Sequence, residues 1–393
     1  MLPIVPAPHP RYLGLIALVL LQAVTGVAPR PAAFAAVFDT IVVDGIHRGA
    51  YPGAVLVVGR RDSILYARGY GGFTWSAASR HPDPDSTVWD VASLTKAVAT
   101  TTALMRLVER DAVALDSPVV HYLPAWRAPG VRRVTVRQLL SHTSGMPAWL
   151  PLHRLATDRD SALRILYHTG PRAGVTGVVY SDLNAILLGE LVEAVAGMPL
   201  DEFWRREVAD PLGLGRSTFR PPRVWARWIA PTGVWRGTAI AGVVNDPNAH
   251  ALGDVAGHAG LFASGADLGR FARMMLAEGA LPDGPGRLLR AETVRTFTSV
   301  AVPARGDASA RTLGWQAVPT GETVSSAGSQ FGARSYGHTG WTGTSLWIDP
   351  ERDVFVLLLT NRAYAPRSSR SFTILKEVRG ALADAAAQLI DGR

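Results

Sequence analysis

The amino-acid sequence predicts an α+β fold. A mainly antiparallel sheet is built from both ends of the chain and flanked by helices, and a helical region is inserted within roughly residues 115–290. Two observations predict this arrangement: strand-turn-strand patterns occur near both ends, and the segments between them follow the helical period. The chain has 393 residues and is 48% hydrophobic, which is enough for a substantial core.

Each end of the predicted sheet consists of two apolar runs around a polar turn. Residues 53–72 (GAVLVVGRRDSILYARGYGG) predict two strands with a turn at Arg60–Ser63. Residues 344–362 (TSLWIDPERDVFVLLLTNR) repeat the pattern with a turn at Asp349–Asp353, and a helix is expected at 371–390. Because the sheet joins both ends of the chain, domain boundaries cannot follow sequence order.

The middle of the chain contains three strong helix signals. Residues 181–197 have an N-cap at Ser181, an apolar helical period and a stop at Gly197. Residues 264–280 form a second such segment. In the third, apolar and small residues recur every three to four positions after Ser93, at Leu94, Val98, Thr101, Met105 and Val108.

The N-terminal segment has the features of a targeting sequence. Arg11 precedes an apolar run at 12–28, and Ala33–Ala35 form a small-residue cleavage site. Residues 1–35 are therefore predicted to be a signal peptide, followed by a single domain at 36–393. The apolar run is short for a membrane span, although a retained anchor is the alternative. We expect an exported protein, periplasmic or extracellular, without stable membrane insertion after cleavage.

Composition excludes several classes of function. The chain has no cysteine, so disulfides, thiol nucleophiles and cysteine-based zinc sites are excluded. The net charge of +8 comes from arginines that are scattered along the chain, which does not predict a nucleic-acid partner. No G-x-S-x-G, G-x-G-x-x-G or P-loop pattern is present, so neither an α/β-hydrolase elbow nor a nucleotide site is expected.

The segment 91–110 (VASLTKAVATTTALMRLVER) contains the first candidate for chemistry. Ser93 and Lys96 are three residues apart, which places them on one helix face. A serine hydroxyl becomes a good nucleophile when a base removes its proton, and lysine can be that base if burial lowers its pKa. Arginine, which supplies all but two of the 40 basic residues, cannot. The alternative, a solvated lysine, is disfavoured by the small apolar residues around it.

Two further motifs are weaker when taken alone. Tyr180 directly precedes a helix N-cap, where a phenol can relay a proton, although a packing tyrosine is the more common case. Residues 336–349 (YGHTGWTGTSLWID) predict a strand whose glycines let a ligand approach the backbone. Such an edge strand could bind substrate through main-chain hydrogen bonds, although a glycine-rich turn is the alternative.

In this order, S-x-x-K, Y-x-D and H-T-G resemble the serine β-lactamase and penicillin-binding-protein superfamily. The tyrosine motif resembles the class C-like branch, and phrases such as VTVRQLLSHTSGMP and VNDPNAHALGDVAGHAGLFAS resemble exported N-acetylmuramyl-L-alanine amidases. The resemblance implies a β-lactamase/DD-peptidase-like fold with no cofactor. It implies that Ser93 is the acylated nucleophile, Lys96 its base and Tyr180 the proton relay. The backbone N–H groups of Ser93 and Trp341 would form the oxyanion hole.

The same resemblance assigns His338, Thr339, Gly340 and Asp182 to substrate binding, and two of these residues depart from the β-lactamase pattern. Asp182 replaces an asparagine and His338 replaces a lysine, which removes an amide and a permanent positive charge near the expected substrate carboxylate. In the amidase-like phrase VND, Asn245 replaces a histidine, so any role of that histidine is lost.

These departures favour an exported serine hydrolase that acts as an amidase on cell-wall fragments. The alternatives are a carboxylesterase, a β-lactamase or D-alanyl-D-alanine carboxypeptidase, and, outside enzymes, a catalytically weak binding or sensing protein with the same fold. The expected partner is a small molecule or a cell-wall fragment. The oligomeric state is not predicted.

Two other histidine-containing segments are interpreted as structural. Acidic and histidine residues recur every four positions at Asp246, His250, Asp254 and His258, which would line one helix face like metal ligands. Pro247, Gly253 and Gly257 argue against a helix there, so we expect a loop at the cleft and no metal. By the resemblance, His142 is a buried hydrogen-bonding residue that supports the cleft, not a triad base.

Overall fold

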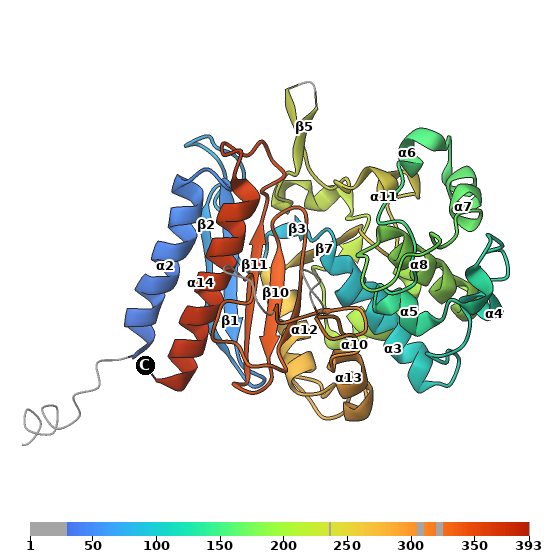
Figure 1. The fold of residues 1–393 in the computed structure, drawn as a ribbon. Coiled ribbons are helices and arrows are strands. Elements are labelled where there is room, and N and C mark those ends of the chain that lie inside the picture. Colours follow the sequence, from blue (N-terminus) through green and yellow to red (C-terminus); the bar gives the residue numbers. More distant parts are fainter. Residues whose placement is uncertain (1–29, 236, 305–309, 320–324, 393) are drawn as a thin grey trace, which may run out of the picture.

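The computed structural model describes residues 30–235, 237–304, 310–319 and 325–392. Its largest sheet has six strands: β1 (Gly53–Gly59), β2 (Ile64–Gly71), β8 (Gln316–Ala317), β9 (Tyr336–Thr339), β10 (Ser345–Asp349) and β11 (Val354–Thr360). Their order is β2-β1-β11-β10-β9-β8, and each neighbouring pair is antiparallel. The first and last strands are adjacent, in register from Ala54↔Thr360 to Gly59↔Phe355 (Figure 1). The prediction of a sheet built from both ends is confirmed.

Both hairpins turn where the sequence predicted, and their turns are joined. Asp353, in the turn between β10 and β11, has a positive φ of 53°. Its carboxylate accepts a hydrogen bond from Nε of Arg61 at 2.9 Å and forms an ion pair with Arg60 at 3.3 Å. Because Arg60 and Arg61 belong to the β1–β2 turn, these ion pairs join the neighbouring strands β1 and β11 at one end of the sheet.

Helices cover both faces of this sheet. Helices α2 (Arg30–His47) and α14 (Ser371–Asp391) lie side by side on one face, and α12 (Gly265–Leu276) packs against β1 and β11 on the other (Figure 1). The helices predicted at 371–390 and 264–280 are confirmed. Helix α2 was not predicted, and the proposed cleavage site at Ala33–Ala35 lies inside it. The apolar run at 12–28 lies outside the described residues.

The middle of the chain is mainly helical, with two small sheets that the sequence did not predict. One sheet has the order β3-β7-β4, and the other is the hairpin β5–β6. Ser181 and Gly197 cap α8 as predicted. The remaining strands are β3 (Val88–Asp90), β4 (Thr218–Phe219), β5 (Gly233–Trp235), β6 (Thr238–Ile240) and β7 (Leu261–Ser264). The helices are η1 (Lys96–Thr101), α3 (Thr102–Glu109), α4 (Val119–Tyr122), η2 (Val131–Arg133), α5 (Val136–Leu140), α6 (Leu152–Leu155), α7 (Arg159–Tyr167), α8 (Asp182–Ala196), α9 (Leu200–Trp204), η3 (Arg205–Ala209), α10 (Asp210–Leu212), η4 (Arg223–Trp228), α11 (Pro247–Ala251) and α13 (Ala291–Thr298).

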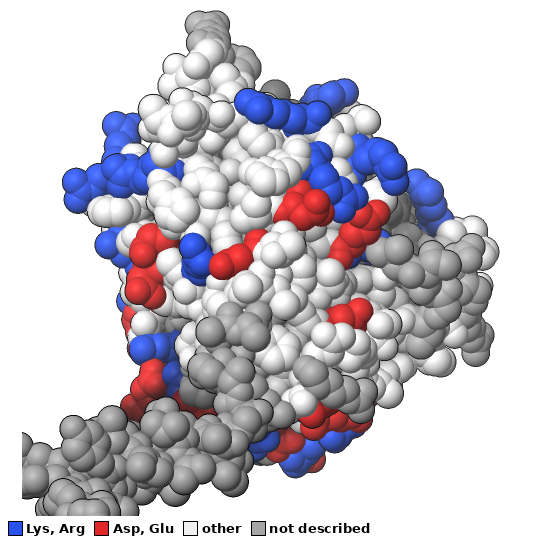
Figure 2. All heavy atoms as spheres, turned by 90° about the vertical axis from the view of Figure 1, so that its left-hand side faces the viewer, with Lys and Arg blue, Asp and Glu red and all other residues white. Residues whose placement is uncertain are grey.

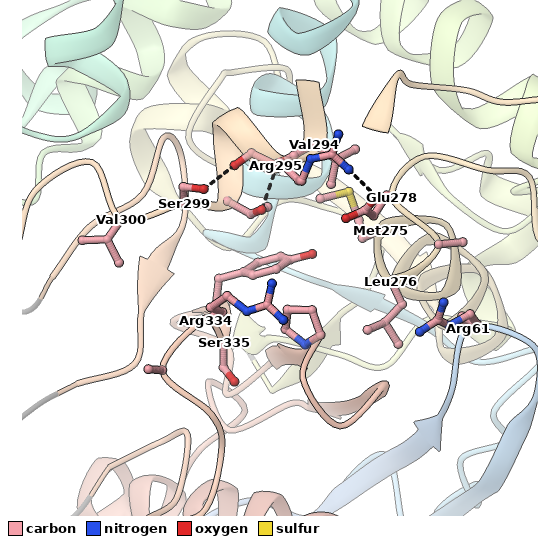
Figure 3. Close-up of a pocket in the computed structure, with 15 residues that line it drawn as sticks. Arg61, Met275, Leu276, Glu278, Val294, Arg295, Ser299, Val300, Arg334 and Ser335 are labelled. Atoms are coloured by element: carbon pink, nitrogen blue, oxygen red, sulfur yellow. Dashed lines mark hydrogen bonds and ion pairs between the residues drawn. The ribbon is translucent and has the colours of Figure 1, made fainter. Parts of the chain in front are cut away.

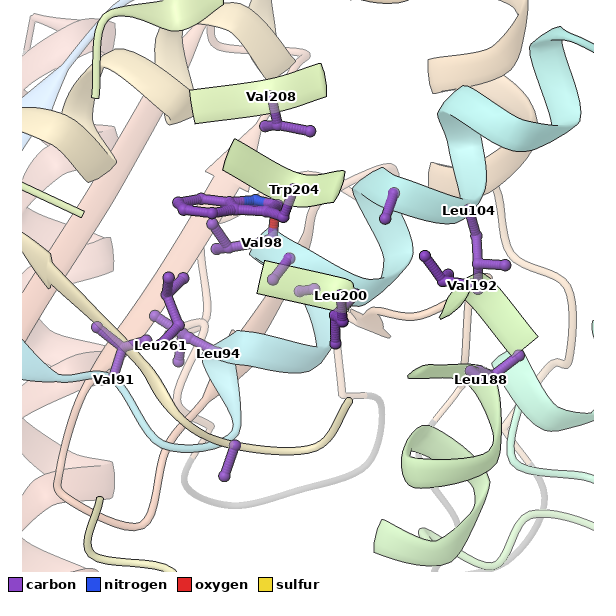
Figure 4. Packing of buried hydrophobic residues seen from close by; sticks show 14 of the residues in the cluster. Val91, Leu94, Val98, Leu104, Leu188, Val192, Leu200, Trp204, Val208 and Leu261 are labelled. Carbon is purple, nitrogen blue, oxygen red and sulfur yellow. The ribbon is translucent and has the colours of Figure 1, made fainter. Parts of the chain in front are cut away.

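The helix that follows Ser93 is buried along its whole first half. Its segment η1 is a π-helix, and every residue of it is buried. The carbonyl of Val98 accepts a hydrogen bond from the indole of Trp204 at 3.1 Å, and Val98 and Leu94 pack near Trp204 and Leu261 (Figure 4). A π-helical turn leaves carbonyls without their usual helical partner, and such turns are frequent at functional sites.

Charged side chains are mixed on the surface on the side of α2 and α14. Figure 2 shows basic and acidic groups interspersed there, so that face presents no field of a single sign. Among the described residues, no single helix is long and apolar enough to span a membrane. Helix α8 and the segment Leu200–Leu212 reach that length and hydropathy only together, and they are bent by 75° at the break between them.

The central strand β11 tests how the sheet is stabilised. Leu357 is fully buried in it, whereas Leu65 on the edge strand β2 is exposed. We expect Leu357→Ala to lower the free energy of unfolding by about 3 kcal/mol, since it leaves a cavity in the core. Leu65→Ala should change it by less than about 0.5 kcal/mol. Urea unfolding measures both; equal losses would contradict this packing.

Candidate active site

A cleft of about 730 Å³ brings together residues from all three motifs. It lies between the β9 side of the large sheet and the helical region. Ser93, Tyr180 and Asp182 line it from the helical region, and residues 338–341 line it from β9 and the following turn. Strand β8 pairs with β9 at Tyr336 and Gly337, and no described strand pairs with this edge at His338 and Thr339. Such an edge can bind an extended substrate.

Ser93 projects from a strained turn that several side chains hold in place. Ala92, directly before it, has a φ of +49°, which is unfavourable for a residue with a side chain. The buried carboxylate of Asp90 accepts hydrogen bonds from the backbone N–H groups of Ala92 at 2.8 Å and Asn245 at 2.7 Å. Burial raises the pKa of Asp90 to about 6 despite these bonds. Asp90 therefore fixes the conformation that exposes Ser93.

The turn after β9 is attached to the same strained segment. The hydroxyls of Thr342 and Thr344 donate to the carbonyls of Asp90 and Val91 at 2.8 and 2.9 Å. Gly340 makes this contact possible, since a Cβ at that position would lie 2.6 Å from the carbonyl oxygen of Val91. The third motif is thus positioned directly against the residues that precede Ser93.

Two backbone N–H groups beside the cleft have no acceptor in the described part of the chain. These are the N–H groups of Ser93 and Trp341, the pair expected to form the oxyanion hole. The carbonyl of Trp341 accepts from Nε of Arg362 at 3.0 Å, and Thr342 accepts from the backbone of Arg362 at 2.7 Å, which fixes this turn. Two fixed and unoccupied donors are what an oxyanion requires.

Lys96 is only 4% exposed and makes three short polar contacts. Its ammonium donates to Ser93 Oγ at 2.9 Å and to the carbonyl of His258 at 3.0 Å, and it forms an ion pair with Asp182 Oδ1 at 2.8 Å. An ammonium has three donors and no acceptor, so all three N–H groups are used.

The expected lowering of the Lys96 pKa is wrong for the free protein. Burial does act to lower it, but the Asp182 carboxylate, helped by Tyr180, outweighs burial and raises the pKa of Lys96 above its ordinary value. Burial conversely acts to raise the pKa of Asp182, and the charges of Lys96 and His258 lower it overall. The pair is therefore ionised, and Lys96 meets Ser93 as a proton donor.

Tyr180 is held at the mouth of the cleft by His142. Nδ1 of His142 accepts the backbone N–H of Ser181 at 3.1 Å, and the two rings of His142 and Tyr180 have centroids 4.7 Å apart. Burial, with the charges of Arg311 and Lys96, lowers the pKa of His142 well below its usual range, so the ring is neutral. Its predicted place as a buried hydrogen-bonding residue agrees with this geometry. The Tyr180 ring centroid lies 5.2 Å from Lys96 Nζ.

His338 carries no charge near neutral pH. It is buried, and Nδ1 contacts the carbonyl of Thr339 at 2.9 Å, so that nitrogen carries the proton. Burial, with the charges of Lys96 and Arg311, lowers the pKa of His338 to about 3. The third motif therefore lacks the positive charge that a lysine would supply.

The segment from Asp246 to His258 contributes to the site through pairs of side chains. His258 Nε2 contacts Asp246 Oδ1 at 2.9 Å, and His250 Nδ1 contacts Asp254 Oδ1 at 2.7 Å. No group of three or more possible ligands occurs among the described residues. The expectation of no helix is wrong in part, because Asp246 caps the short helix α11, which begins at Pro247. Proline suits a first helical position.

Sequence reasoning missed Asp90 and Arg311. A signal for Asp90 was available, since it is an acid inside the apolar run before Ser93. Arg311 lines the cleft, with its guanidinium 5.2 Å from the Tyr180 ring centroid, but nothing in its local sequence indicates this position.

A separate cavity of about 510 Å³ offers no comparable chemistry (Figure 3). Arg295 and Glu278 form an ion pair across it at 2.7 Å, and Ser299 donates to the carbonyl of Arg295. Arg295, Glu278 and Ser299 therefore have partners, whereas the buried hydroxyl of Ser335, which also lines this cavity, has none among the described residues.

Comparison with known proteins agrees with this geometry. The family model described as Beta-lactamase matches residues 38–378, which include all three motifs. The chain belongs to the beta-lactamase family. The resemblance inferred from the sequence is confirmed.

Two relatives within this family have names that refer to cell-wall substrates. The chain is 30% identical over 353 residues to the putative D-alanyl-D-alanine carboxypeptidase of Escherichia coli (strain K12), with 80% of each covered. It is 30% identical over 368 residues to the N-acetylmuramyl-L-alanine amidase of Bacillus subtilis (strain 168), which covers 84% of this chain and 81% of the relative.

Solved structures confirm the beta-lactamase-type fold. EstCE1, described as a hydrolase with promiscuous acyltransferase activity, has a TM-score of 0.70 at 21% identity and covers 91% of this chain and 100% of its own. A penicillin-binding protein homologue from Caulobacter crescentus has a TM-score of 0.67 at 22% identity, with coverages of 92% and 99%.

The neutral state of His338 predicts how stability depends on pH. The ordinary histidine pKa is 6.5, so between pH 6.5 and about 3 the unfolded chain binds a proton that the folded chain does not. Stability therefore falls as the pH drops through this range, by about 2 kcal/mol at pH 5 for this histidine. We expect the free energy of unfolding of His338→Asn, measured with urea, to fall by about 2 kcal/mol less between pH 7 and pH 5 than that of the wild-type chain. An unchanged pH dependence, equal to that of the exposed-site control His121→Asn, would contradict this.

Proposed function

We propose that the chain is a serine hydrolase that works through an acyl-Ser93 intermediate. One observation carries this proposal: Ser93 Oγ accepts a hydrogen bond from a buried ammonium at 2.9 Å, beside two backbone N–H groups that have no acceptor among the described residues. An ammonium stabilises negative charge that develops on the attacking oxygen, and the two N–H groups stabilise the oxyanion. This chemistry uses proton transfer and fixed dipoles alone.

The proton path follows from the charge of Lys96. Because its three donors are used, Lys96 does not accept the proton of Ser93 in this state. We propose that the Tyr180 hydroxyl, which can donate and accept, relays it: the Ser93 proton moves to the Tyr180 oxygen while the Tyr180 proton moves to the leaving group. The Ser93 oxygen bonds to the substrate carbonyl carbon, and the bond to the leaving group breaks. Water then cleaves the acyl-enzyme by the reverse relay.

The substrate that we favour is an amide in a cell-wall fragment. The names of the relatives from Escherichia coli and Bacillus subtilis support this class. The uncharged His338 and the ion-paired Asp182 support an amidase over a β-lactamase, because neither side chain offers a cation or an amide to a lactam substrate. A carboxylesterase is the second candidate, supported by the fold shared with EstCE1. A cell-wall substrate also supports export of the protein through the segment 1–35.

Labelling with a fluorophosphonate probe tests the nucleophile. We expect the wild-type chain to be labelled and Ser93→Ala not to be, because only an activated serine reacts. Turnover of muramyl-dipeptide, p-nitrophenyl acetate and nitrocefin then separates amidase, esterase and β-lactamase. An unlabelled wild-type chain would leave the binding or sensing protein as the better interpretation, and fast nitrocefin turnover would overturn the preference for an amidase.

Substitution of Lys96 tests the role of its ammonium. We expect Lys96→Arg to slow probe labelling by about 100-fold or more while the protein stays folded. A planar guanidinium neither fits the three acceptors around Nζ nor gives up a proton. The matched control is Lys376→Arg, at the second lysine of the chain, which lies in α14. Equal labelling rates for the two variants would rule out a catalytic part for Lys96.

A further inference from the structure

The charged groups that line the cleft do not balance. Its two carboxylates already have partners, since Asp182 pairs with Lys96 and Asp246 pairs with His258. Arg311, in the segment before β8, also lines the cleft. In the described part of the chain its guanidinium has no ion pair and no hydrogen-bond acceptor, and its Nε is completely shielded from solvent. Its one described side-chain contact is the face of Tyr180.

A guanidinium in this position costs free energy. Arginine stays protonated even where burial acts against the charge, as it does for Arg311, whose pKa burial lowers from its usual range. Removing an unpaired charge from water is unfavourable unless a counter-charge is supplied. A ligand that brings a negative charge to the guanidinium of Arg311 would explain why an arginine occupies this position.

Arg379, which also lines the cleft, and Arg362 are both buried and differ from the half-buried Arg311, because structural groups anchor them. Arg379 donates to the carbonyl of Thr344 at 3.0 Å. Arg362 donates to Trp341 and Ser371 and stacks on the ring of Phe372 at 3.7 Å. Among the described residues Arg311 has no such anchor for its side chain, while its backbone is fixed by hydrogen bonds with Val302. Within that part of the chain it is thus a cation with free donors beside the reacting groups.

We propose that Arg311 binds a carboxylate of the substrate and so determines substrate specificity. This proposal rests on the proposed function, because it concerns the same cleft. Arg311 and His338 both lie close to the Tyr180 ring, at 5.2 and 6.0 Å. The positive charge missing from the third motif is thereby supplied from the segment before β8, on the side where Tyr180 meets the leaving group. The preferred substrate carries its carboxylate on the leaving group, within a few bonds of the scissile bond, where a planar guanidinium can bind both oxygens.

A matched pair of ligands tests this assignment without turnover. 3-Acetoxybenzoate and 3-acetoxybenzamide have the same shape, but only the first carries a carboxylate on the leaving group. Calorimetry on the Ser93→Ala protein should show the benzoate binding about tenfold or more tightly than the benzamide, a preference that Ser93→Ala/Arg311→Gln loses and Ser93→Ala/Arg311→Lys keeps in part. Any result without that preference, including no binding of either compound, overturns the proposal.

Kinetics and stability separate this role from a structural one. With Ser93 intact, Arg311→Gln should lower the benzoate-to-benzamide ratio of kcat/KM about tenfold or more, mainly through KM of the benzoate. An equal loss on both esters would mean that Arg311 only positions Tyr180, and would overturn the proposal. Urea unfolding should show Arg311→Gln to be as stable as the exposed-site control Arg205→Gln or more stable, since a half-buried charge without a partner among the described residues is removed; a clear loss of stability would count against the proposal. Failure of the proposed function shows separately, as a wild-type chain that the fluorophosphonate probe does not label.

Discussion

The ammonium of Lys96 joins three segments that lie far apart in the sequence. It contacts Ser93 one helical turn away, Asp182 at the start of α8, and the carbonyl of His258 in the segment before β7. Removing any of these partners would leave a buried charge or a buried acceptor unsatisfied, which is costly. This explains a lysine here in a chain whose other basic residues, apart from Lys376, are all arginines. A compact ammonium with three separate donors can meet three acceptors at 2.8 to 3.0 Å, and a planar guanidinium cannot.

Around this junction, the site stores backbone strain that other contacts maintain. The positive φ of Ala92 is unfavourable by itself, and Asp90 together with the hydroxyls of Thr342 and Thr344 holds it in place. Gly257 supports the site in a related way. A Cβ there would lie 2.0 Å from the carbonyl of Ala185, so only glycine lets the loop approach α8 and present the carbonyl of His258 to Lys96. The geometry at Ser93 is therefore set by residues outside its own helix.

Local pattern was enough to predict much of this molecule. Alternating and continuous apolar runs predicted both hairpins, and their pairing followed from their places at the two ends of the chain. The spacing of Ser93 and Lys96 predicted their contact, because a helix brings residues three apart together. The charge state of Lys96 could not be predicted in this way, since it depends on Asp182, which lies far away in the sequence. Arg311 was missed for the same reason, because its position beside Tyr180 arises from tertiary packing and leaves no local signal.

In this cleft the positive charge lies on Arg311 and not on the third motif at His338. A histidine in the third motif is neutral here because it is buried beside two cations, Lys96 and Arg311. If it were protonated, three positive groups would surround Tyr180 with only Asp182 and Asp246 to offset them. The uncharged ring is thus what allows Arg311 to remain a cation at this position. A lysine at 338 would have to compete with Arg311 for the same anion, or raise the electrostatic cost of both. The neutral third motif and the unpaired arginine therefore depend on each other, and recognition of an anion is assigned to the segment before β8 while β9 keeps its backbone free for the substrate.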